Sequence, residues 1–196
     1  GTVDSAASLE RVLVAASALP QPPLVVVDEA YFEFAGETVT PWRHRFPNLV
    51  AVRTLSKAFA LPGVRVGFGI GARDVVARLE RVRPPGSIST ISAQVGAEAL
   101  RRPEVAHANV RGLALERAWF AARLHDAGWQ SMPSVTNFLL VRFGDHASAE
   151  EAAERLLRSG IVPRTFGPAN PLRGHLRLTV RSRDENERLL QVVRAA

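Results

Sequence analysis

The sequence predicts an α/β protein in which a mixed, mostly parallel sheet is followed by a smaller C-terminal α/β domain. Three observations lead to this prediction: apolar runs of strand length that end in polar residues, long helical stretches behind them, and a renewed alternation of strands and helices near the C-terminus. The chain has 196 residues, 46% of them hydrophobic, which is enough to bury a core. We place the first domain over residues 1–102, and a connecting helix with the second domain over residues 103–196.

The first domain opens on a helix and a strand. Apolar positions recur at helical spacing over residues 5–18, and Asp4 or Ser5 can serve as the N-cap. After a proline-rich break, residues 24–27 form a continuous apolar stretch that ends in Asp28. Such a run is typical of a strand that is buried on both faces.

Two further strands complete the predicted sheet. Residues 48–53 form the second strand and lead into the polar segment 54–57, and residues 64–70 form the third. The connection between them is about ten residues long, which is shorter than a parallel crossover through a helix needs. We therefore expect the third strand to run antiparallel to its neighbours. The glycines of residues 67–71 lack the spacing of a dinucleotide-binding loop and indicate close packing within this strand.

Three helices follow the sheet. The spacing of apolar residues predicts them over residues 73–83, 88–101 and 103–127. Pro103 separates the last two helices, and Gly128 stands where a helix C-cap is expected.

The C-terminal part of the chain has the pattern of a small α/β unit. Its predicted elements are, in order, a strand (137–143), a helix (147–159), two strands (161–164 and 175–180) and a helix (184–195). We expect these elements to build the second domain.

Arginine supplies almost all of the positive charge. Of the 25 basic residues, 24 are arginine and one, Lys57, is lysine, and the formal net charge is +6. The arginines are spread along the chain and stand beside acidic residues on predicted helix faces, which is typical of solvated surfaces. We therefore expect no nucleic-acid partner, although a basic chain invites that interpretation. A coding bias alone can explain the scarcity of lysine.

Other composition features narrow the range of sites and locations. The absence of cysteine excludes disulfides and thiolate metal sites and is compatible with a reducing compartment. The five histidines show no ligand spacing, so we expect no bound metal. The longest apolar runs are of strand length and are interrupted by charges, so we expect no membrane partner and a cytoplasmic location.

Residues suited to chemistry stand at the ends of two predicted strands. Asp28 and Tyr31 follow the first strand, and Lys57 follows the second. In open α/β sheets, ligands bind outside the carboxyl ends of the strands. When a lysine amine is buried in such a pocket, its charged form loses solvation and its pKa falls. The neutral amine can then attack an aldehyde.

The neighbours of Lys57 extend this idea to a cofactor. Thr54, Ser56 and Arg65 offer two hydroxyls and a guanidinium, which suit a phosphate. Asp28 can hold a heterocyclic nitrogen protonated, which makes the ring an electron sink. An aldehyde, a phosphate and a basic ring nitrogen on one molecule describe pyridoxal phosphate. Two simpler interpretations stay open: Asp28 caps a turn, and Lys57 is a surface residue.

Four segments resemble one enzyme family. Val-Asp-Glu-Ala-Tyr at residues 27–31 and the segment that begins Arg-Thr-Leu-Ser-Lys-Ala-Phe at residues 53–67 are similar to the core of fold-type I pyridoxal-phosphate-dependent aminotransferases (class I/II), in particular the histidinol-phosphate aminotransferase group. Thr-Asn-Phe at residues 136–138 and Leu-Arg-Leu-Thr-Val at residues 176–180 are similar to the same group. The resemblance covers essentially the whole chain. It implies an aspartate-aminotransferase-like fold whose large domain binds the cofactor.

The resemblance implies a role for each matching residue around pyridoxal 5'-phosphate. Lys57 would bond to the cofactor aldehyde and then act as the general acid and base of transamination. Asp28 would pair with the pyridine nitrogen, and Tyr31 would hydrogen-bond the ring oxygen. The residues that would hold the cofactor phosphate are Thr54, Ser56 and Arg65.

The resemblance also implies substrates and an assembly. The expected reaction is transamination between histidinol phosphate and the pair glutamate/2-oxoglutarate, in histidine biosynthesis. Arg177 would bind the carboxylate of the amino donor or the phosphate of the substrate. Arg164 is a second candidate for anion contact, and Asn137 resembles a family position beside the substrate arginine. The expected partners are therefore a small-molecule amino donor and a keto acceptor, and the expected assembly is a homodimer.

Two other enzyme activities of the same fold and an inactive fragment remain as alternatives to this function. The protein can be an aromatic amino-acid aminotransferase or a phospho-amino-acid decarboxylase. The first two residues, Gly1 and Thr2, resemble the end of a cofactor-binding loop of the family, so we expect a C-terminal portion that lacks the N-terminal half. Such a portion would leave one edge of the large-domain sheet uncovered and would be an inactive fragment when isolated.

Overall fold

The chain divides into two compact units in the computed structural model, which describes residues 1–195. One unit is Val3–Val110, and the other joins Gly1–Thr2 to the chain from Arg111 onward. The boundary lies within α5 (Pro103–Asp126), a helix of 24 residues.

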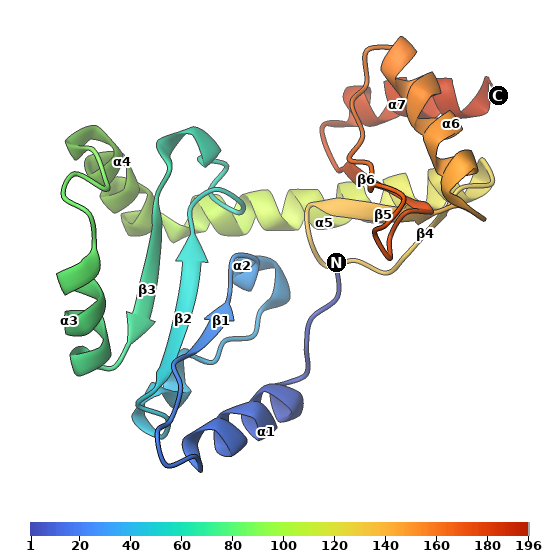
Figure 1. The fold of residues 1–196 in the computed structure, drawn as a ribbon. Helices are drawn as coiled ribbons and strands as arrows, with labels where there is room; N and C mark the ends of the chain where they lie inside the picture. Colours follow the sequence, from blue (N-terminus) through green and yellow to red (C-terminus); the bar gives the residue numbers. More distant parts are fainter. Residues whose placement is uncertain (196) are drawn as a thin grey trace. The chain divides into compact units, whose positions relative to one another are not determined.

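The first unit holds a three-stranded mixed sheet (Figure 1). β1 (Val25–Asp28) lies parallel to β2 (Leu49–Thr54), and β3 (Gly67–Gly71) runs antiparallel on the other side of β2. The prediction of an antiparallel third strand is therefore confirmed. The short connection after β2 turns the chain back along the same strand, because it cannot cross the sheet and return.

One helix covers one face of this sheet. α1 (Ala6–Ser17) begins after Ser5, whose side chain caps it, so the second of the two N-cap candidates is the one used. Leu13 is fully buried in a core that includes Leu49 and Ala51 of β2. The helical spacing of the apolar residues thus fixes which side of α1 meets the sheet.

The opposite face of β1 is open. Val25 and Val27 pack against the core that contains Leu13, whereas Val26 is 54% exposed. The expectation that this strand is buried on both faces is therefore wrong for the structure. The physical reason is that β1 is an edge strand of this sheet, and the side chains of β1 meet a core on one face only.

The glycines of β3 allow close strand packing. A Cβ at Gly71 would lie 3.1 Å from Val50 Cγ2, and a Cβ at Gly67 would lie 3.0 Å from the carbonyl oxygen of Arg53. Larger side chains at these positions would push β3 away from β2. Close packing, and not a nucleotide loop, explains this run of glycines, as predicted.

Two helices follow β3 within the first unit, α3 (Arg73–Val82) and α4 (Thr90–Arg101). α4 packs closely through Gly96, where a Cβ would lie 3.3 Å from Leu55 Cδ1 and 3.3 Å from Val66 Cγ1. Leu55 is fully buried beneath this contact. Gly96 therefore lets α4 support the segment that follows β2.

We expect Gly96→Leu to destabilise the protein by about 1–3 kcal/mol, because the added side chain overpacks the contact with Leu55 and Val66. Gly112→Leu is the matched control, since a Cβ at this exposed helical glycine meets no atom within 4 Å. The control should gain about 0.5–1 kcal/mol from helix propensity. Urea unfolding of the full-length protein measures both changes. Equal midpoints for the two variants would contradict the close packing at Gly96.

The second unit contains an antiparallel sheet of β4 (Gln130–Ser131), β5 (Phe138–Arg142) and β6 (His175–Thr179), in that order. α6 (His146–Arg158) and α7 (Arg183–Arg194) supply part of its core. Phe120 and Leu124 of α5 supply another part, and both are fully buried. Gly128 has a φ of 82°, so the predicted cap after α5 is confirmed.

One predicted strand is absent from the second unit as described. Residues 161–164 were expected to form a strand, but only Arg164 pairs, in an isolated bridge with Arg177 of β6. Pro163 has no N–H to donate to a ladder, and Val162 is 82% exposed. The apolar residues Ile161 and Val162 therefore resemble a strand in the sequence, but Pro163 limits the pairing of this segment to Arg164.

Several short elements were not predicted. They are too short for a hydrophobic period to be seen in the sequence. These elements are α2 (Phe32–Ala35), the 3-10 helices η1 (Thr40–His44) and η2 (Pro62–Val64), and β4 (Gln130–Ser131).

Two kinds of feature are absent from the described residues. Within residues 1–195, no helix combines the length and the apolar character needed to cross a bilayer. In the same residues, His, Asp and Glu side chains form no group of three or more that could hold a metal ion.

Candidate functional site

The first unit brings three chain segments to one edge of its sheet. β1 and β2 end at this edge, with Asp28 paired to Val52 in the register. β3 begins there, because Thr54 pairs with Gly67. The residues predicted for cofactor binding thus stand at the carboxyl ends of the parallel strands or beside them (Figure 1).

Two hydroxyls lie together at the end of β2. The oxygens of Thr54 and Ser56 are 2.9 Å apart, and the Ser56 backbone N–H donates to Thr54 Oγ1 at 3.1 Å. Thr54 Oγ1 also lies 3.2 Å from the carbonyl oxygen of Val66, so β3 helps to orient it. Both side chains are half-buried, which leaves hydroxyl oxygens available to a ligand.

Lys57 is half-buried and faces an aromatic ring. Its Nζ lies 5.5 Å from the centroid of the Tyr31 ring, within range of a cation–π contact. The segment that carries Lys57 is anchored by Leu55 and Ala58, which are both fully buried. Asn109 Nδ2 donates to the Ala58 carbonyl oxygen at 3.0 Å. The buried neighbours and the Asn109 hydrogen bond therefore hold the backbone that carries the Lys57 amine.

The segment after Lys57 contains two unusual backbone conformations. Ala60 has a φ of 55° and Arg65 a φ of 58°, and among the described residues they are the non-glycine residues in the left-handed region. Such conformations cost about 1–3 kcal/mol each and concentrate at functional sites. The exposed Arg65 guanidinium donates to the carbonyl oxygen of Pro62 at 2.9 Å, beside the strand ends.

Asp28 is the last residue of β1, and its side chain is exposed. Its Oδ1 accepts a hydrogen bond from the Ala30 N–H at 2.9 Å. This bond is the turn cap that the simpler interpretation proposes for Asp28. It engages one carboxylate oxygen, so a cap and a ligand contact are compatible at this residue.

The sequence predictions missed a buried ion pair behind these residues. Arg53 Nη2 lies 2.9 Å from Glu29 Oε2, and the two side chains are 16% and 6% exposed. Thr38 Oγ1 donates to Glu29 Oε2 at 2.9 Å, and the Val39 N–H donates to Glu29 Oε1 at 2.6 Å. In the sequence, Glu29 and Arg53 are visible only as charged residues at the ends of two apolar runs. Nearby, burial raises the pKa of the Glu33 carboxyl above its ordinary value.

The residues predicted for substrate binding lie in the second unit. Arg164 and Arg177 pair through both backbone hydrogen bonds, at 3.0 and 2.9 Å, and both side chains are exposed. The Arg177 guanidinium carbon lies 5.1 Å from the centroid of the Phe138 ring. Asn137 accepts a hydrogen bond from the Val180 N–H through its backbone oxygen, at 2.9 Å. The structure thus brings the two arginines together as direct cross-strand neighbours.

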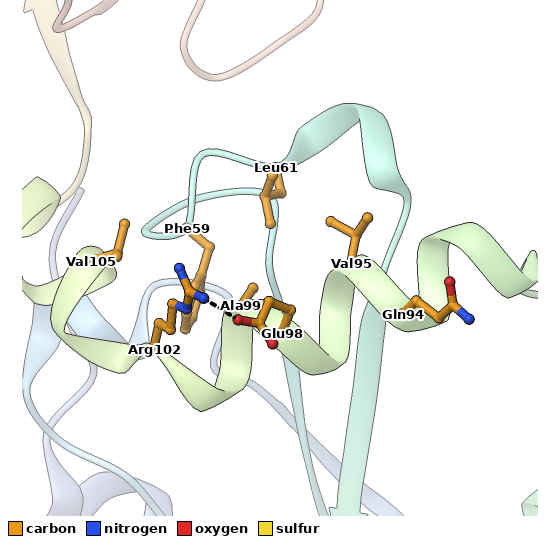
Figure 2. A pocket seen from close by; sticks show the side chains of 8 residues that line it. All are labelled: Phe59, Leu61, Gln94, Val95, Glu98, Ala99, Arg102 and Val105. Carbon is orange, nitrogen blue, oxygen red and sulfur yellow. Dashed lines mark ion pairs between the residues drawn. The ribbon is translucent and has the colours of Figure 1, made fainter.

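An apolar pocket of about 470 Å³ lies in the first unit, beside the segment that follows Lys57 (Figure 2). Phe59 and Leu61 from this segment face Val95 of α4 across it. Glu98 and Arg102 form an ion pair at 2.7 Å on its wall. None of the residues predicted for cofactor binding lines this pocket.

Comparison with known proteins gives consistent matches. The family described as aminotransferase class I and II matches residues 2–193. The histidinol-phosphate aminotransferase of Caldanaerobacter subterraneus subsp. tengcongensis is 37% identical over 172 residues, which is 87% of this chain and 48% of the relative. The enzyme of the same name from Nocardia farcinica is 40% identical over 190 residues, 96% of this chain and 46% of the relative.

A solved structure supports the same likeness. The crystal structure of histidinol-phosphate aminotransferase from Sinorhizobium meliloti in complex with pyridoxal-5'-phosphate superposes with a TM-score of 0.83 at 30% identity. The match covers 95% of this chain and 53% of that one. The chain therefore spans about half the length of the curated relatives it matches.

Proposed function

The chain belongs to the class I and II aminotransferase family, and from this premise we propose that the full-length protein transaminates histidinol phosphate, with glutamate/2-oxoglutarate as the amino partner and pyridoxal 5'-phosphate as cofactor. The predicted fold class and family are confirmed by these matches. The substrate assignment draws support from the names of the relatives. The observation that carries the proposal is the half-buried Lys57 beside the Tyr31 ring at the end of a parallel strand.

The chemistry of the side chains fits the cofactor. The paired hydroxyls of Thr54 and Ser56, with the cationic Arg65, suit its phosphate. The Asp28 carboxylate suits a protonated ring nitrogen, and the Tyr31 hydroxyl suits a ring oxygen. When bound, pyridoxal 5'-phosphate supplies an aldehyde for amine attachment and a protonated ring that withdraws electrons from the substrate α-carbon.

Lys57 moves the protons in this proposal. Its Nζ would hold the cofactor through the aldehyde group. The same Nζ would also act as general base and acid, accepting the proton of the substrate α-carbon and donating it again. The half-buried amine is suited to this role because its fully buried neighbours Leu55 and Ala58 anchor the backbone that carries it.

The two arginines of the second unit would bind the anionic parts of the substrates. Arg164 is paired with Arg177 of β6 in an isolated antiparallel bridge, so the two side chains lie on the same face. Two adjacent guanidinium groups repel each other unless an anion lies between them. A carboxylate or a phosphate can bond to both. Asn137, which directly precedes β5, stays a candidate for the same site.

A homodimer and a cytoplasmic location stay predictions. Exposed apolar side chains on the first unit supply surface that a second subunit could cover, and Ile91 of α4 is 75% exposed. The apolar pocket at Phe59 and Val95 adds to this surface. Sedimentation of the full-length protein would test the assembly directly.

A single-turnover assay tests the proposed substrate. The full-length protein loaded with pyridoxal 5'-phosphate is mixed separately with histidinol phosphate, phenylalanine and threonine phosphate, and the cofactor absorbance is followed. We expect the rate per unit concentration with histidinol phosphate to exceed the other two by at least about tenfold. A faster reaction with phenylalanine would point to an aromatic amino-acid aminotransferase. Release of carbon dioxide from threonine phosphate would point to a decarboxylase.

A further inference from the structure

The buried pair of Glu29 and Arg53 lies directly behind the candidate site. Arg53 meets the same carboxylate oxygen twice, through Nη2 at 2.9 Å and through Nε at 3.0 Å. Glu29 also extends the strand ladder, because its N–H donates to the Val52 carbonyl oxygen at 2.8 Å. The pair therefore joins the ends of two parallel strands.

The alternation of side chains places the pair and the site on opposite faces. Val27 and Ala51 are register partners that pack in the core below the sheet, and Glu29 and Arg53 continue that face two residues further on. Asp28 precedes Glu29 by one residue, so it belongs to the other face. Thr54 follows Arg53 by one residue, so it lies on the same face as Asp28. Each member of the pair is thus bonded in the chain to a residue of the site.

The pair also fixes the segment that carries Tyr31. The Arg53 guanidinium carbon lies 3.6 Å from the centroid of the Phe32 ring, the residue after Tyr31. At the far end of the segment, Thr38 donates to Glu29 and accepts from Arg53 Nη2 at 2.8 Å. Residues 29–39 are therefore tied back to one carboxylate at both ends. The Tyr31 ring lies over Lys57 in this arrangement.

Stability alone does not account for such a pair. A buried ion pair is often no more stabilising than apolar side chains of the same size, because both charges lose their solvation. What an apolar pair cannot supply is a fixed direction for the backbone on either side. Here that backbone leads to Asp28 and Tyr31 on one strand and to Thr54 and Lys57 on the other.

We propose that Glu29 and Arg53 are positioning residues that hold Asp28 and Tyr31 in register with Thr54, Ser56 and Lys57. The inference rests on the proposed function, since it concerns the site for pyridoxal 5'-phosphate. The pair touches neither substrate nor cofactor. It acts through the strand ends, by keeping the ring contact of Tyr31 and the carboxylate of Asp28 at a fixed distance from the lysine.

The double variant Glu29→Gln/Arg53→Met tests this role, because it leaves no unpaired charge, keeps similar side-chain volume and retains an amide oxygen that can accept from the Val39 N–H. Two quantities are measured on the full-length apoprotein: the dissociation constant of pyridoxal 5'-phosphate, by fluorescence titration, and the thermal unfolding midpoint. We expect the dissociation constant to rise about 10- to 100-fold, the size of effect found for residues that orient ligand-binding groups. The midpoint of the apoprotein should stay close to that of the wild type.

A milder variant covers the case in which the double variant does not fold. Thr38→Val removes the hydroxyl that bonds to Glu29, Arg53 and Thr40, with little change in volume. We expect a smaller rise in the dissociation constant with an unchanged midpoint. Glu80→Gln is the surface control, since its ion pair with Arg83 is exposed and its loss should change neither quantity.

The outcomes separate this inference from the proposed function. If the wild-type apoprotein does not bind pyridoxal 5'-phosphate, the proposed function fails. If the wild type binds it and the folded variants bind it equally well, the positioning role alone is wrong. A rise in the dissociation constant that merely follows a fall in the unfolding midpoint would also overturn the positioning role, because it would assign the pair to stability.

Discussion

Lys57→Ala is expected to lower turnover of the full-length protein by at least about 10³-fold, because in the proposed function Lys57 is both the nucleophile and the group that moves the proton. The same variant should lose the covalent bond to the cofactor. Treatment of the wild type with borohydride should fix one cofactor on the peptide that contains Lys57, as seen by mass spectrometry. The variant should show no such peptide.

Lys57→Arg is the control that separates charge from chemistry. Arginine keeps the positive charge and most of the length, so cation–π attraction to the Tyr31 ring can persist. Its guanidinium does not lose a proton in proteins and cannot serve as the amine. Lys57→Arg should therefore be as inactive as Lys57→Ala. Turnover above one tenth of the wild type in either variant would remove Lys57 from the mechanism.

The chemical difference between lysine and arginine explains why the chain would keep a single lysine. A coding bias toward arginine can act at every position where a permanent positive charge is sufficient. It cannot act where the chemistry needs an amine that gains and loses a proton. The proposal thus accounts for the one position at which lysine persists among 25 basic residues.

The sequence predicted those features of the fold that depend on hydrophobic period and connection length. The antiparallel course of β3 followed from a connection too short for a crossover. The cap at Gly128 followed from its place after a helical pattern. Residues 161–164 misled because the apolar pair before Pro163 resembles a strand, while the proline permits one bridge only.

The candidate site could be predicted only where single residues carry the chemistry. Asp28 stood out because it ends an apolar strand, and Lys57 because it is the single lysine of the chain. The left-handed conformations of Ala60 and Arg65 have no sequence signal, since neither residue type favours them. The Glu29–Arg53 pair was missed for a different reason. Glu29 and Arg53 form an ion pair only because β1 and β2 lie side by side, and the sequence of either strand alone does not show which residues become neighbours.

Asp28→Asn is expected to lower turnover by roughly 10- to 150-fold, the equivalent of one hydrogen bond to a charged group, about 1.5–3 kcal/mol. The loss arises because a neutral amide does not hold a ring nitrogen protonated. Stability should change little, since the asparagine side-chain oxygen can still accept the hydrogen bond from the Ala30 N–H. Steady-state kinetics and the unfolding midpoint of the full-length protein measure the two effects.

Asp28→Ala and Asp74→Asn complete the comparison. Asp28→Ala loses the charge and the turn cap together, so it should lose turnover as Asp28→Asn does and also unfold at a lower temperature. Asp74→Asn, in the first turn of α3, removes a carboxylate away from the strand ends and should keep full turnover. The two interpretations of Asp28 thus predict different pairs of results. If Asp28→Asn keeps wild-type turnover while Asp28→Ala is merely less stable, the carboxylate is a turn cap and the ring nitrogen must find its partner elsewhere.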